Sequence, residues 1–193
     1  RGIDVGEEGQ VTVEEIEDFI KSGASLQDWI ASDIENRLRP RTPLIFEDAD
    51  STKIIPGIKA ETTCKNQPGQ DVAKLFDYDE ASMWHTDWAG GAVPFTMEID
   101  LGGLNELDKL EYLPREDGGN GTLLQGTVSY SADRKVGSDP VAFTWAADGS
   151  VKSFVFEEKA PARYLKMAIT SARGNFGSGR EMYIFKVPGT ETV

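Results

Sequence analysis

The chain has 193 residues, with 33 acidic and 20 basic side chains and a formal net charge of −13 at pH 7. This length suffices for one well-buried core, and no apolar run approaches the roughly 18 residues of a membrane-spanning helix. The negative charge argues against nucleic acid and anionic membrane lipid as partners, because both usually bind to a basic surface. A neutral ligand fits this charge best.

Residues 11–38 carry a helical pattern, unlike the rest of the chain. Thr12 and Glu15 have the spacing of a capping box, and Gly23 separates two segments. The apolar positions of the two segments are Val13, Ile16, Phe19 and Ile20, followed by Leu26, Ile30, Ile34 and Leu38. Pro40 and Pro43 end the pattern. We therefore expect a short N-terminal helical extension and linker over residues 1–43, which must pack on another domain or partner to bury its apolar stripe.

From residue 44 onward the period of the apolar residues changes to two. Phe95, Met97 and Ile99 alternate with polar residues, and the segment around Leu165 and Met167 does the same. Shorter apolar runs lie near residues 128–130, 141–145, 151–156 and 182–187, separated by turns rich in Gly and Asp. Several short strands with such turns indicate an all-β sandwich over residues 44–193.

Residues 75–86, LFDYDEASMWHT, combine oxygen ligands with the only histidine of the chain. Asp77, Asp79 and Ser82 lie close together in one short segment, which suits a hard cation that takes several oxygens, backbone carbonyls included. The alternative is that both aspartates are ordinary turn residues. His85 and Trp88 follow directly, and this amphipathic pair suits a polar, ring-shaped ligand.

Four motifs in chain order resemble one known family: LFDYDEASMWHT, FTMEIDLG (residues 95–102), LEYLPREDGGNG (110–121) and REMYIF (180–185). Together they resemble the family 32 carbohydrate-binding modules, part of the discoidin (coagulation factor type C-terminal) superfamily. The resemblance implies a galactose-binding-like jelly-roll sandwich over residues 44–193, with its ligand loops gathered at one end.

The resemblance also implies a structural calcium site. Asp77 would give a side-chain oxygen, Ser82 its hydroxyl and carbonyl, and Glu181 a carboxylate from the last strand. The backbone carbonyls of Lys74, Asp79 and Arg180 would complete the shell. At this site two positions depart from the family pattern: Tyr78 stands where glycine is common, and Arg180 replaces a small residue, which is harmless if Arg180 supplies only its carbonyl. A third departure, Val136-Gly137 in place of a frequent tryptophan, does not touch the site.

The same resemblance implies a sugar site with His85, Arg115 and Asn120 as polar groups. The Arg115 guanidinium holds several hydrogen-bond donors in a fixed planar arrangement, Asn120 offers a donor and an acceptor, and His85 can accept a hydrogen bond from a hydroxyl. Phe176 would supply a flat apolar face, and Trp88 could serve instead. Without the resemblance, Asn120 reads as a turn residue, Arg115 as a surface ion-pair partner and His85 as a structural histidine.

The function expected from these features is non-catalytic binding of galactose- or hexosamine-type glycan ends. We expect the chain to be one module of a larger glycan-processing protein, extracellular or on a bacterial cell surface. The sequence has no nucleophile elbow, zinc-protease motif or Cys/His cluster, so no enzymatic activity is expected. The alternative is a structural or protein-interaction module on the same fold with a degenerate sugar site.

Overall fold

The computed structural model describes residues 54–188, apart from residues 91 and 160. The chain divides into two compact units, Arg1–Arg41 and Thr42–Val193. The helical extension predicted over residues 1–43 lies outside the described residues. Within the described part, no helix has the length and apolar character needed to cross a membrane.

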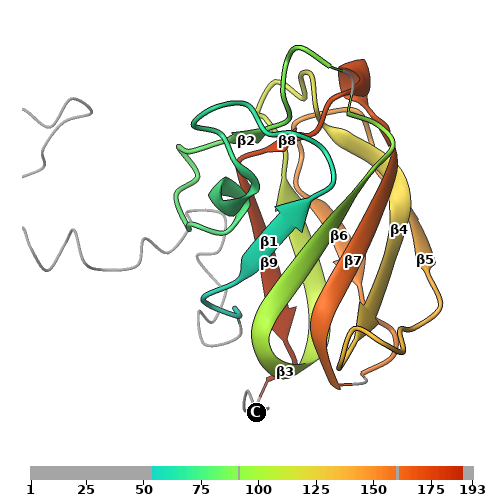
Figure 1. The fold of residues 1–193 in the computed structure, drawn as a ribbon. Helices are drawn as coiled ribbons and strands as arrows, with labels where there is room; N and C mark the ends of the chain where they lie inside the picture. The colour runs from blue at the N-terminus through green and yellow to red at the C-terminus, as the bar shows by residue number, and fades with distance from the viewer. Residues whose placement is uncertain (1–53, 91, 160, 189–193) are drawn as a thin grey trace, which may run out of the picture. The chain divides into compact units, whose positions relative to one another are not determined.

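The described domain is built from β-strands and two 3₁₀ turns, η3 and η4 (Figure 1). In chain order the elements are β1 (Lys59–Thr62), η3 (Val72–Leu75), β2 (Trp84–His85), β3 (Phe95–Leu113), β4 (Leu123–Ser131), β5 (Val141–Thr144), β6 (Lys152–Val155), β7 (Pro161–Ala172), η4 (Arg173–Asn175), β8 (Ser178–Gly179) and β9 (Glu181–Lys186). The expectation of an all-β fold for this region is confirmed.

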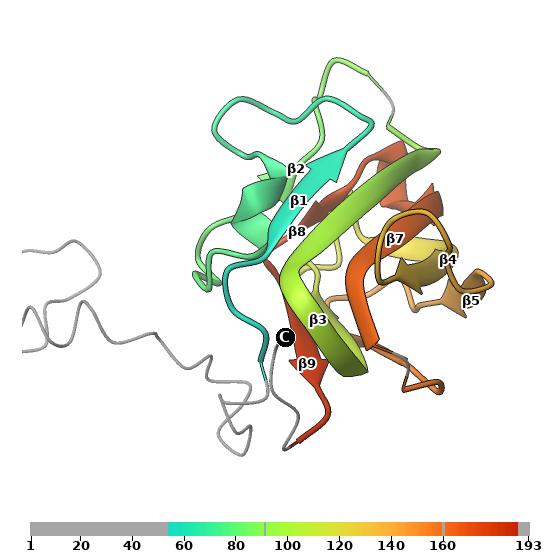
Figure 2. The same cartoon turned by 60° about the horizontal axis from the view of Figure 1, so that its bottom comes forward.

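The long strand β3 takes part in both layers of the sandwich. Its first part pairs with β1 and β7, and the sheet continues through β4 to β5. Its last part pairs with β6 and β9. The pairing register shifts between Asp100 and Asn105, where Gly102 has φ +79° and donates its N–H to Asp100 Oδ1 at 2.9 Å. Figure 2 shows the resulting bend in β3.

The core lies between the two layers and follows the alternation predicted from the sequence. The inward side chains of β3 and β7 are at most 4% exposed: Phe95, Met97, Ile99, Leu101, Leu165, Met167 and Ile169. Trp84 of β2 is fully buried, and its indole N–H donates to Asn66 Oδ1 at 2.9 Å. Burial of these large apolar side chains is the main stabilising contribution to the fold.

Candidate functional site

The short β2–β8 pair holds the predicted histidine at one end of the sandwich (Figure 1). His85 lies opposite Ser178 in the antiparallel register. Next to it, the Thr86 N–H donates to the Gly177 carbonyl at 2.8 Å, and the Gly177 N–H donates to Thr86 Oγ1 at 3.0 Å. A Cβ on Gly177 would come within 2.7 Å of the Trp84 ring. The loop before β8 therefore lies directly on the core.

Two aromatic rings, those of Trp88 and Phe176, lie beside the His85 ring. The His85 ring centroid is 6.1 Å from that of Trp88, edge to face, and 5.7 Å from that of Phe176. His85 is 4% exposed, whereas Trp88 is 63% exposed. Because a carbonyl can only accept, the 2.6 Å contact from His85 Nδ1 to the Thr86 carbonyl makes Nε2 the acceptor in the neutral ring. The structure thus brings His85, Trp88 and Phe176 together, with both candidate aromatics beside the histidine.

Asn120 is exposed and lies beside this cluster. Its backbone carbonyl accepts a hydrogen bond from Ser178 Oγ at 2.9 Å, and Ser178 is the register partner of His85. A Cβ on Gly174 would lie 2.5 Å from Asn120 Oδ1, so the amide side chain rests against the loop that carries Phe176. The structure therefore places Asn120 next to the strand pair that holds His85.

Arg115 lies in a neighbouring depression rather than in contact with His85. Its Nε and Nη2 atoms are 3.2 and 3.0 Å from the two carboxylate oxygens of Asp117. The Gly119 N–H and then the Arg115 guanidinium hold the pKa of Asp117 below its usual range. The depression is also lined by Gln70, whose backbone carbonyl accepts from the His85 N–H at 3.1 Å. Arg115 thus faces a hollow that borders the histidine strand.

Gln70 is a candidate that the sequence did not single out. Its Oε1 atom is buried and lacks a hydrogen-bond partner among the described residues, and the residue lines the depression together with Arg115. Buried polar groups are nearly always paired, so an unpaired amide oxygen beside a depression is a candidate acceptor for a ligand hydroxyl. A lone glutamine in a loop has no motif or spacing that could have revealed it.

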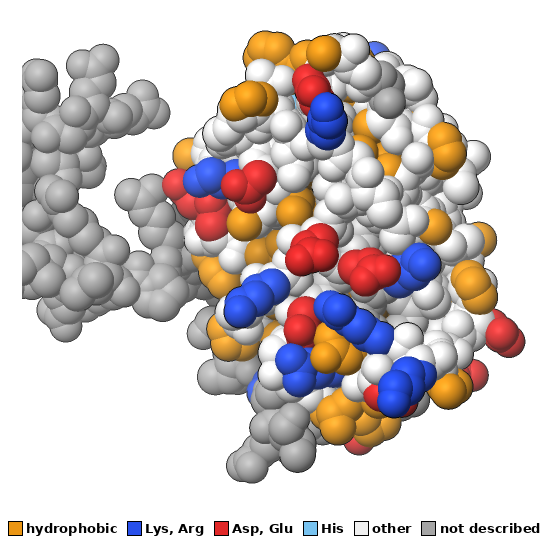
Figure 3. Space-filling model, in the orientation of Figure 1, with side chains coloured by type: hydrophobic (Ala, Val, Ile, Leu, Met, Phe, Trp, Pro, Cys, Tyr) orange, Lys and Arg blue, Asp and Glu red, His pale blue; other side chains and the backbone are white. Residues whose placement is uncertain are grey.

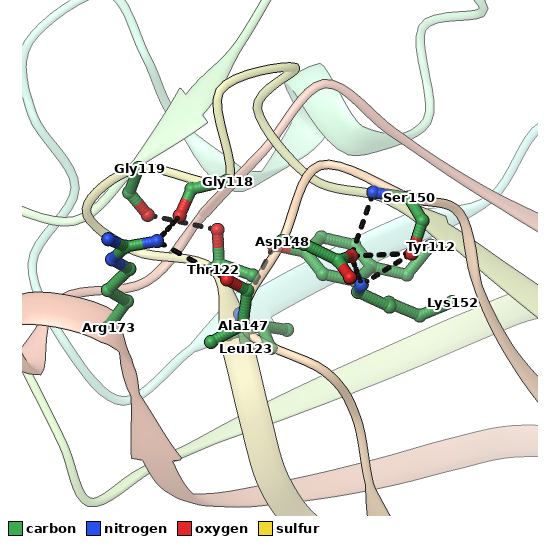
Figure 4. A network of polar contacts seen from close by, with 10 residues as sticks. All are labelled: Tyr112, Gly118, Gly119, Thr122, Leu123, Ala147, Asp148, Ser150, Lys152 and Arg173. Carbon is green, nitrogen blue, oxygen red and sulfur yellow. Dashed lines mark hydrogen bonds and ion pairs between the residues drawn. The ribbon is translucent and has the colours of Figure 1, made fainter.

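The loop that carries Arg115 and Asn120 is held from below by Arg173 (Figure 4). Arg173 Nη1 donates to the Gly118 carbonyl at 2.8 Å and to the Ala147 carbonyl at 3.3 Å. On the same loop, Thr122 Oγ1 donates to the Gly119 carbonyl at 2.9 Å. One guanidinium therefore joins the 115–121 loop to the turn around residue 147.

That turn is itself fixed by the buried ammonium of Lys152 (Figure 4). The Lys152 side chain is 3% exposed and forms an ion pair with Asp148, and its Nζ is 2.9 Å from Ser150 Oγ. Lys152, followed by Ser150, lowers the pKa of Asp148 to about 2. Burying a charge is costly unless it is paired, so this pair specifies one conformation for the turn. The 115–121 loop packs against this turn.

Gly149, at the contact between these two loops, offers a direct test of this support. A Cβ there would lie 1.9 Å from the Glu116 carbonyl oxygen, which belongs to the backbone and cannot rotate away. Gly149→Ala is therefore expected to displace the Arg115 loop, to lower stability by about 1–3 kcal/mol and to weaken ligand binding. Gly137→Ala, whose Cβ would meet no atom closer than 3.6 Å, is the control. Melting curves and titrations check both, and equal behaviour of the two variants would contradict the proposed support.

The predicted cation segment forms one tight turn around Asp77. The two carboxylate oxygens of Asp77 lie 2.9 and 3.0 Å from Ser82 Oγ, and they also accept from Lys74 Nζ at 3.2 Å and from the Asp79 N–H at 3.1 Å. The Asp79 carbonyl accepts from the Ser82 N–H at 2.9 Å. Ser82 Oγ is 3.4 Å from the Lys74 carbonyl. The structure therefore brings these four predicted residues together.

Glu181 at the start of β9 adds a buried carboxylate to this turn. It is fully buried, and its Oε1 accepts from the Met182 N–H at 3.2 Å. Its Oε2 is buried without a hydrogen-bond partner among the described residues. Burial, together with the negative charges of Asp77 and Glu80, raises the pKa of Glu181 to about 9. A cation beside Asp77 would supply a positive charge to Glu181, which forms no ion pair with a described residue.

The two departures from the family pattern are compatible with such an ion. Tyr78 has φ +59°, so its backbone takes the conformation that favours glycine, and its hydroxyl donates to the Ile55 carbonyl at 2.6 Å. The Arg180 side chain donates to the Pro114 carbonyl and to Glu116, each at 3.0 Å. These contacts engage its guanidinium elsewhere and leave the carbonyl as the only group it can offer to the cation segment.

The donors of this segment fit calcium better than a transition metal. The described residues contain no group of three or more His, Cys, Asp or Glu side chains that could hold a metal. A cation here would depend on Asp77 and Glu181 together with a hydroxyl and backbone carbonyls. Calcium accepts such a mixed set of oxygens, and the buried, unpaired Glu181 Oε2 is the observation that favours it.

Comparison with known proteins identifies the family of this domain. Residues 57–182 match the F5/8 type C domain family. Two curated relatives are galactose oxidases from Gibberella zeae, 35% and 34% identical over 119 residues. Each match covers 58% of this chain but only 17% of the oxidase, so the chain spans a small part of the length of these relatives.

Solved structures of similar fold include family 32 carbohydrate-binding modules from Clostridium perfringens. The module of NanJ in complex with galactose has a TM-score of 0.62 and 27% identity, covering 69% of this chain and 98% of that one. The module CpGH89CBM32-5, in complex with GalNAc-β-1,3-galactose, has a TM-score of 0.60 and 26% identity, covering 68% and 99%. These likenesses confirm the galactose-binding-like jelly-roll sandwich.

Proposed function

This chain belongs to the F5/8 type C domain family, and on that premise we propose that it binds carbohydrate, with galactose- or hexosamine-type glycan ends as its ligands. The F5/8 type C domain and the similar family 32 modules are not catalytic, which confirms the expectation that this chain is not an enzyme. The sugars bound to the NanJ and CpGH89CBM32-5 modules support the ligand class.

The observation that carries the proposal is the cluster of His85, Trp88 and Phe176, joined through Ser178 to Asn120. Aromatic faces pack on the C–H groups of a pyranose, and a histidine acceptor and an amide select hydroxyls by geometry. Arg115 in the adjoining depression would donate to a further hydroxyl. A shallow site of this kind binds weakly, at about −4 to −6 kcal/mol.

Calcium is proposed as a structural ion of the same domain. Asp77, Ser82 and Glu181 would hold it with side-chain oxygens, and Lys74, Asp79 and Arg180 with backbone carbonyls. A bound ion would neutralise the two carboxylates and tie the turn before β2 to the start of β9. Its binding energy would then add to the stability of the fold.

The parent protein is proposed to be a larger glycan-processing protein, extracellular or on a bacterial cell surface. The galactose oxidases, of which the match covers 17%, support a larger parent chain. The similar modules from Clostridium perfringens support a bacterial source. Weak single-site binding becomes useful when several modules act together, because linkage raises the effective concentration of each site. Other domains of the parent chain are therefore the expected partners, besides the glycan.

A glycan array on this protein tests the proposed function. We expect signal from galactose- and N-acetylgalactosamine-ended glycans, displaced by free galactose, and none from oligonucleotides or anionic liposomes because of the net charge of −13. No signal across the array, with an intact melting transition, would instead favour a structural or protein-interaction module with a degenerate sugar site.

Separate removal of the two aromatic rings should show how they share the sugar contact. Phe176→Ala is expected to weaken binding about fivefold to tenfold, since a lost ring contact costs about 1 kcal/mol, without changing the preferred sugar. Trp88 is the more exposed ring, so Trp88→Ala should weaken sugar binding with little change in melting temperature. Titration calorimetry with galactose and N-acetylgalactosamine measures both. Unchanged affinity in both variants would exclude stacking at this cluster.

A further inference from the structure

The outer face of the sheet formed by β3, β7 and β4 carries a cleft remote in sequence from the loops described above. It has a volume of about 170 Å³ and is lined by Glu98, Ser129, Ser131, Arg134, Tyr164 and Lys166, among others. The strand register explains the grouping, because Glu98 and Ser129 both lie opposite Lys166, and Ser131 lies opposite Tyr164. Figure 3 shows Lys and Arg side chains, with acidic ones among them, gathered over the lower part of the molecule in this view.

Arg134 reaches this cleft from a turn with an unfavourable backbone. Its φ is +66°, in the left-handed region where any residue with a Cβ is less stable than glycine. The turn is fixed by Ser131 Oγ, which accepts from the Arg134 N–H at 3.1 Å, and by Asp133 Oδ1, which accepts from the Lys135 N–H at 2.8 Å. The Arg134 guanidinium carbon lies 4.4 Å from the centroid of the Tyr164 ring. The turn thus holds an arginine where glycine would be easier to accommodate.

The two cations of the cleft, Arg134 and Lys166, have acidic residues nearby but form no ion pair with them in the part of the chain that the structure describes. Glu98 lies opposite Lys166 in the strand register. The hydrogen bond from Arg163, followed by the positive charge of Arg134, lowers the pKa of Asp100. The nearby Asp100 is engaged by Arg163, with Nε–Oδ1 and Nη2–Oδ2 distances of 2.9 and 3.2 Å. Neither Arg134 nor Lys166 forms an ion pair with a described residue. Two cations without an ion pair beside one cleft are unexpected in a chain of net charge −13, and they favour a ligand that carries a negative group.

We propose that this cleft is a second carbohydrate site, which takes a single sugar ring bearing a carboxylate. Arg134 and Lys166 would hold the carboxylate through charge-assisted hydrogen bonds, while Ser129 and Ser131 would bond to ring hydroxyls. Glu98 favours a sugar over a bare inorganic anion, because its carboxylate can accept hydrogen bonds from ring hydroxyls, which a fully ionised inorganic anion lacks. The cleft has room for one ring rather than for an extended chain.

The test compares a galacturonic acid dimer with a neutral galactose dimer, titrated into the whole chain. Arg134→Gly is expected to weaken binding of the acidic dimer at least tenfold, the loss typical of a hydrogen bond to a charged group. The same change should leave the melting temperature equal or higher, since glycine suits φ +66°. Lys166→Gln should also weaken acidic-dimer binding. Lys135→Gln removes the same charge from the same turn without touching the cleft, and should leave affinity unchanged.

Several outcomes would overturn this second site, and they differ from failure of the loop site. The proposal fails if the wild-type chain does not bind the acidic dimer, if Arg134→Gly retains full affinity, or if Lys135→Gln loses as much as Arg134→Gly. Displacement of the dimer by inorganic phosphate at equal concentration would reduce the cleft to a simple anion site and also contradict the proposal. Loss of neutral-dimer binding in Arg115→Ala, with acidic-dimer binding retained, is the pattern expected of two independent sites.

Discussion

Replacement of Arg115 by alanine is expected to remove detectable binding of galactose-ended glycans while the melting temperature changes little. Arg115 contributes to stability through an exposed ion pair with Asp117, and such pairs are worth about 0–1 kcal/mol. Its hydrogen bonds to a ligand would be worth about 1.5–3 kcal/mol, or roughly 10- to 150-fold in affinity. Because binding begins weak, this loss exceeds what calorimetry can follow.

Two companion variants make the result specific to the Arg115 side chain. Arg115→Lys keeps the charge but loses the planar fork, so it should bind with intermediate affinity. Asn120→Ala should lose binding as Arg115→Ala does, because its exposed amide would lose both the donor and the acceptor that it offers to a ligand. Calorimetric titration and melting curves on the three variants measure affinity and stability together. Unaltered binding in Arg115→Ala would place the sugar site elsewhere on the domain.

Removal of calcium is expected to lower the melting temperature by about 5–10 °C, and added calcium should restore it. An ion present at a hundredfold excess over its dissociation constant adds about 2.7 kcal/mol to folding, and a domain of this size shifts by about 2–4 °C per kcal/mol. Asp77→Ala should reproduce the loss without a chelator. Asp79→Ala is the matched control, because only its backbone carbonyl is proposed as a ligand. A melting curve indifferent to chelator would remove the calcium proposal.

Glu181→Gln is expected to be at least as stable as wild type when a chelator is present, but less stable than wild type when calcium is present. With a chelator, burial raises the pKa of Glu181 to about 9, so at pH 8 wild type must protonate this group on folding, which lowers its stability. Glutamine is neutral and avoids this cost, so the variant should melt at the same temperature as wild type or higher. With calcium, wild type should be the more stable protein, because glutamine cannot neutralise the ion. Melting curves of wild type and Glu181→Gln at pH 8, recorded with chelator and with calcium, measure this reversal. A variant that is less stable than wild type by the same margin in both conditions would contradict it.

The sequence predicted the inward faces of the strands well but not their arrangement in the sheets. Alternation of Met97 and Ile99 with polar residues predicts which side chains are buried, and this was confirmed in β3 and β7. The same alternation cannot reveal that β3 continues for 19 residues and pairs in both layers, because pairing depends on residues distant in sequence. β1, with the sequence KAET, was missed because it lacks large apolar residues.

The candidate sites show the same division between local and distant information. Asp77, Ser82 and His85 stand close together in the sequence, so their chemistry could be recognised from spacing, and the motif around Glu181 linked the last strand to them. The contact of Arg134 with Tyr164 joins a turn to a separate strand, and the unpaired Gln70 oxygen depends on burial. Neither could be predicted without the fold.

The most direct test of carbohydrate binding at the β2–β8 end of the sandwich is a titration of galactose into the isotopically labelled chain, followed by nuclear magnetic resonance. Signals of the Trp88 indole, the Asn120 side-chain amide and the Gly177 backbone amide are expected to shift with one common dissociation constant, while the Tyr164 backbone amide on the sheet face stays unchanged. Shifts confined to other parts of the domain, or no shift at tens of millimolar galactose, would contradict the proposed sugar site.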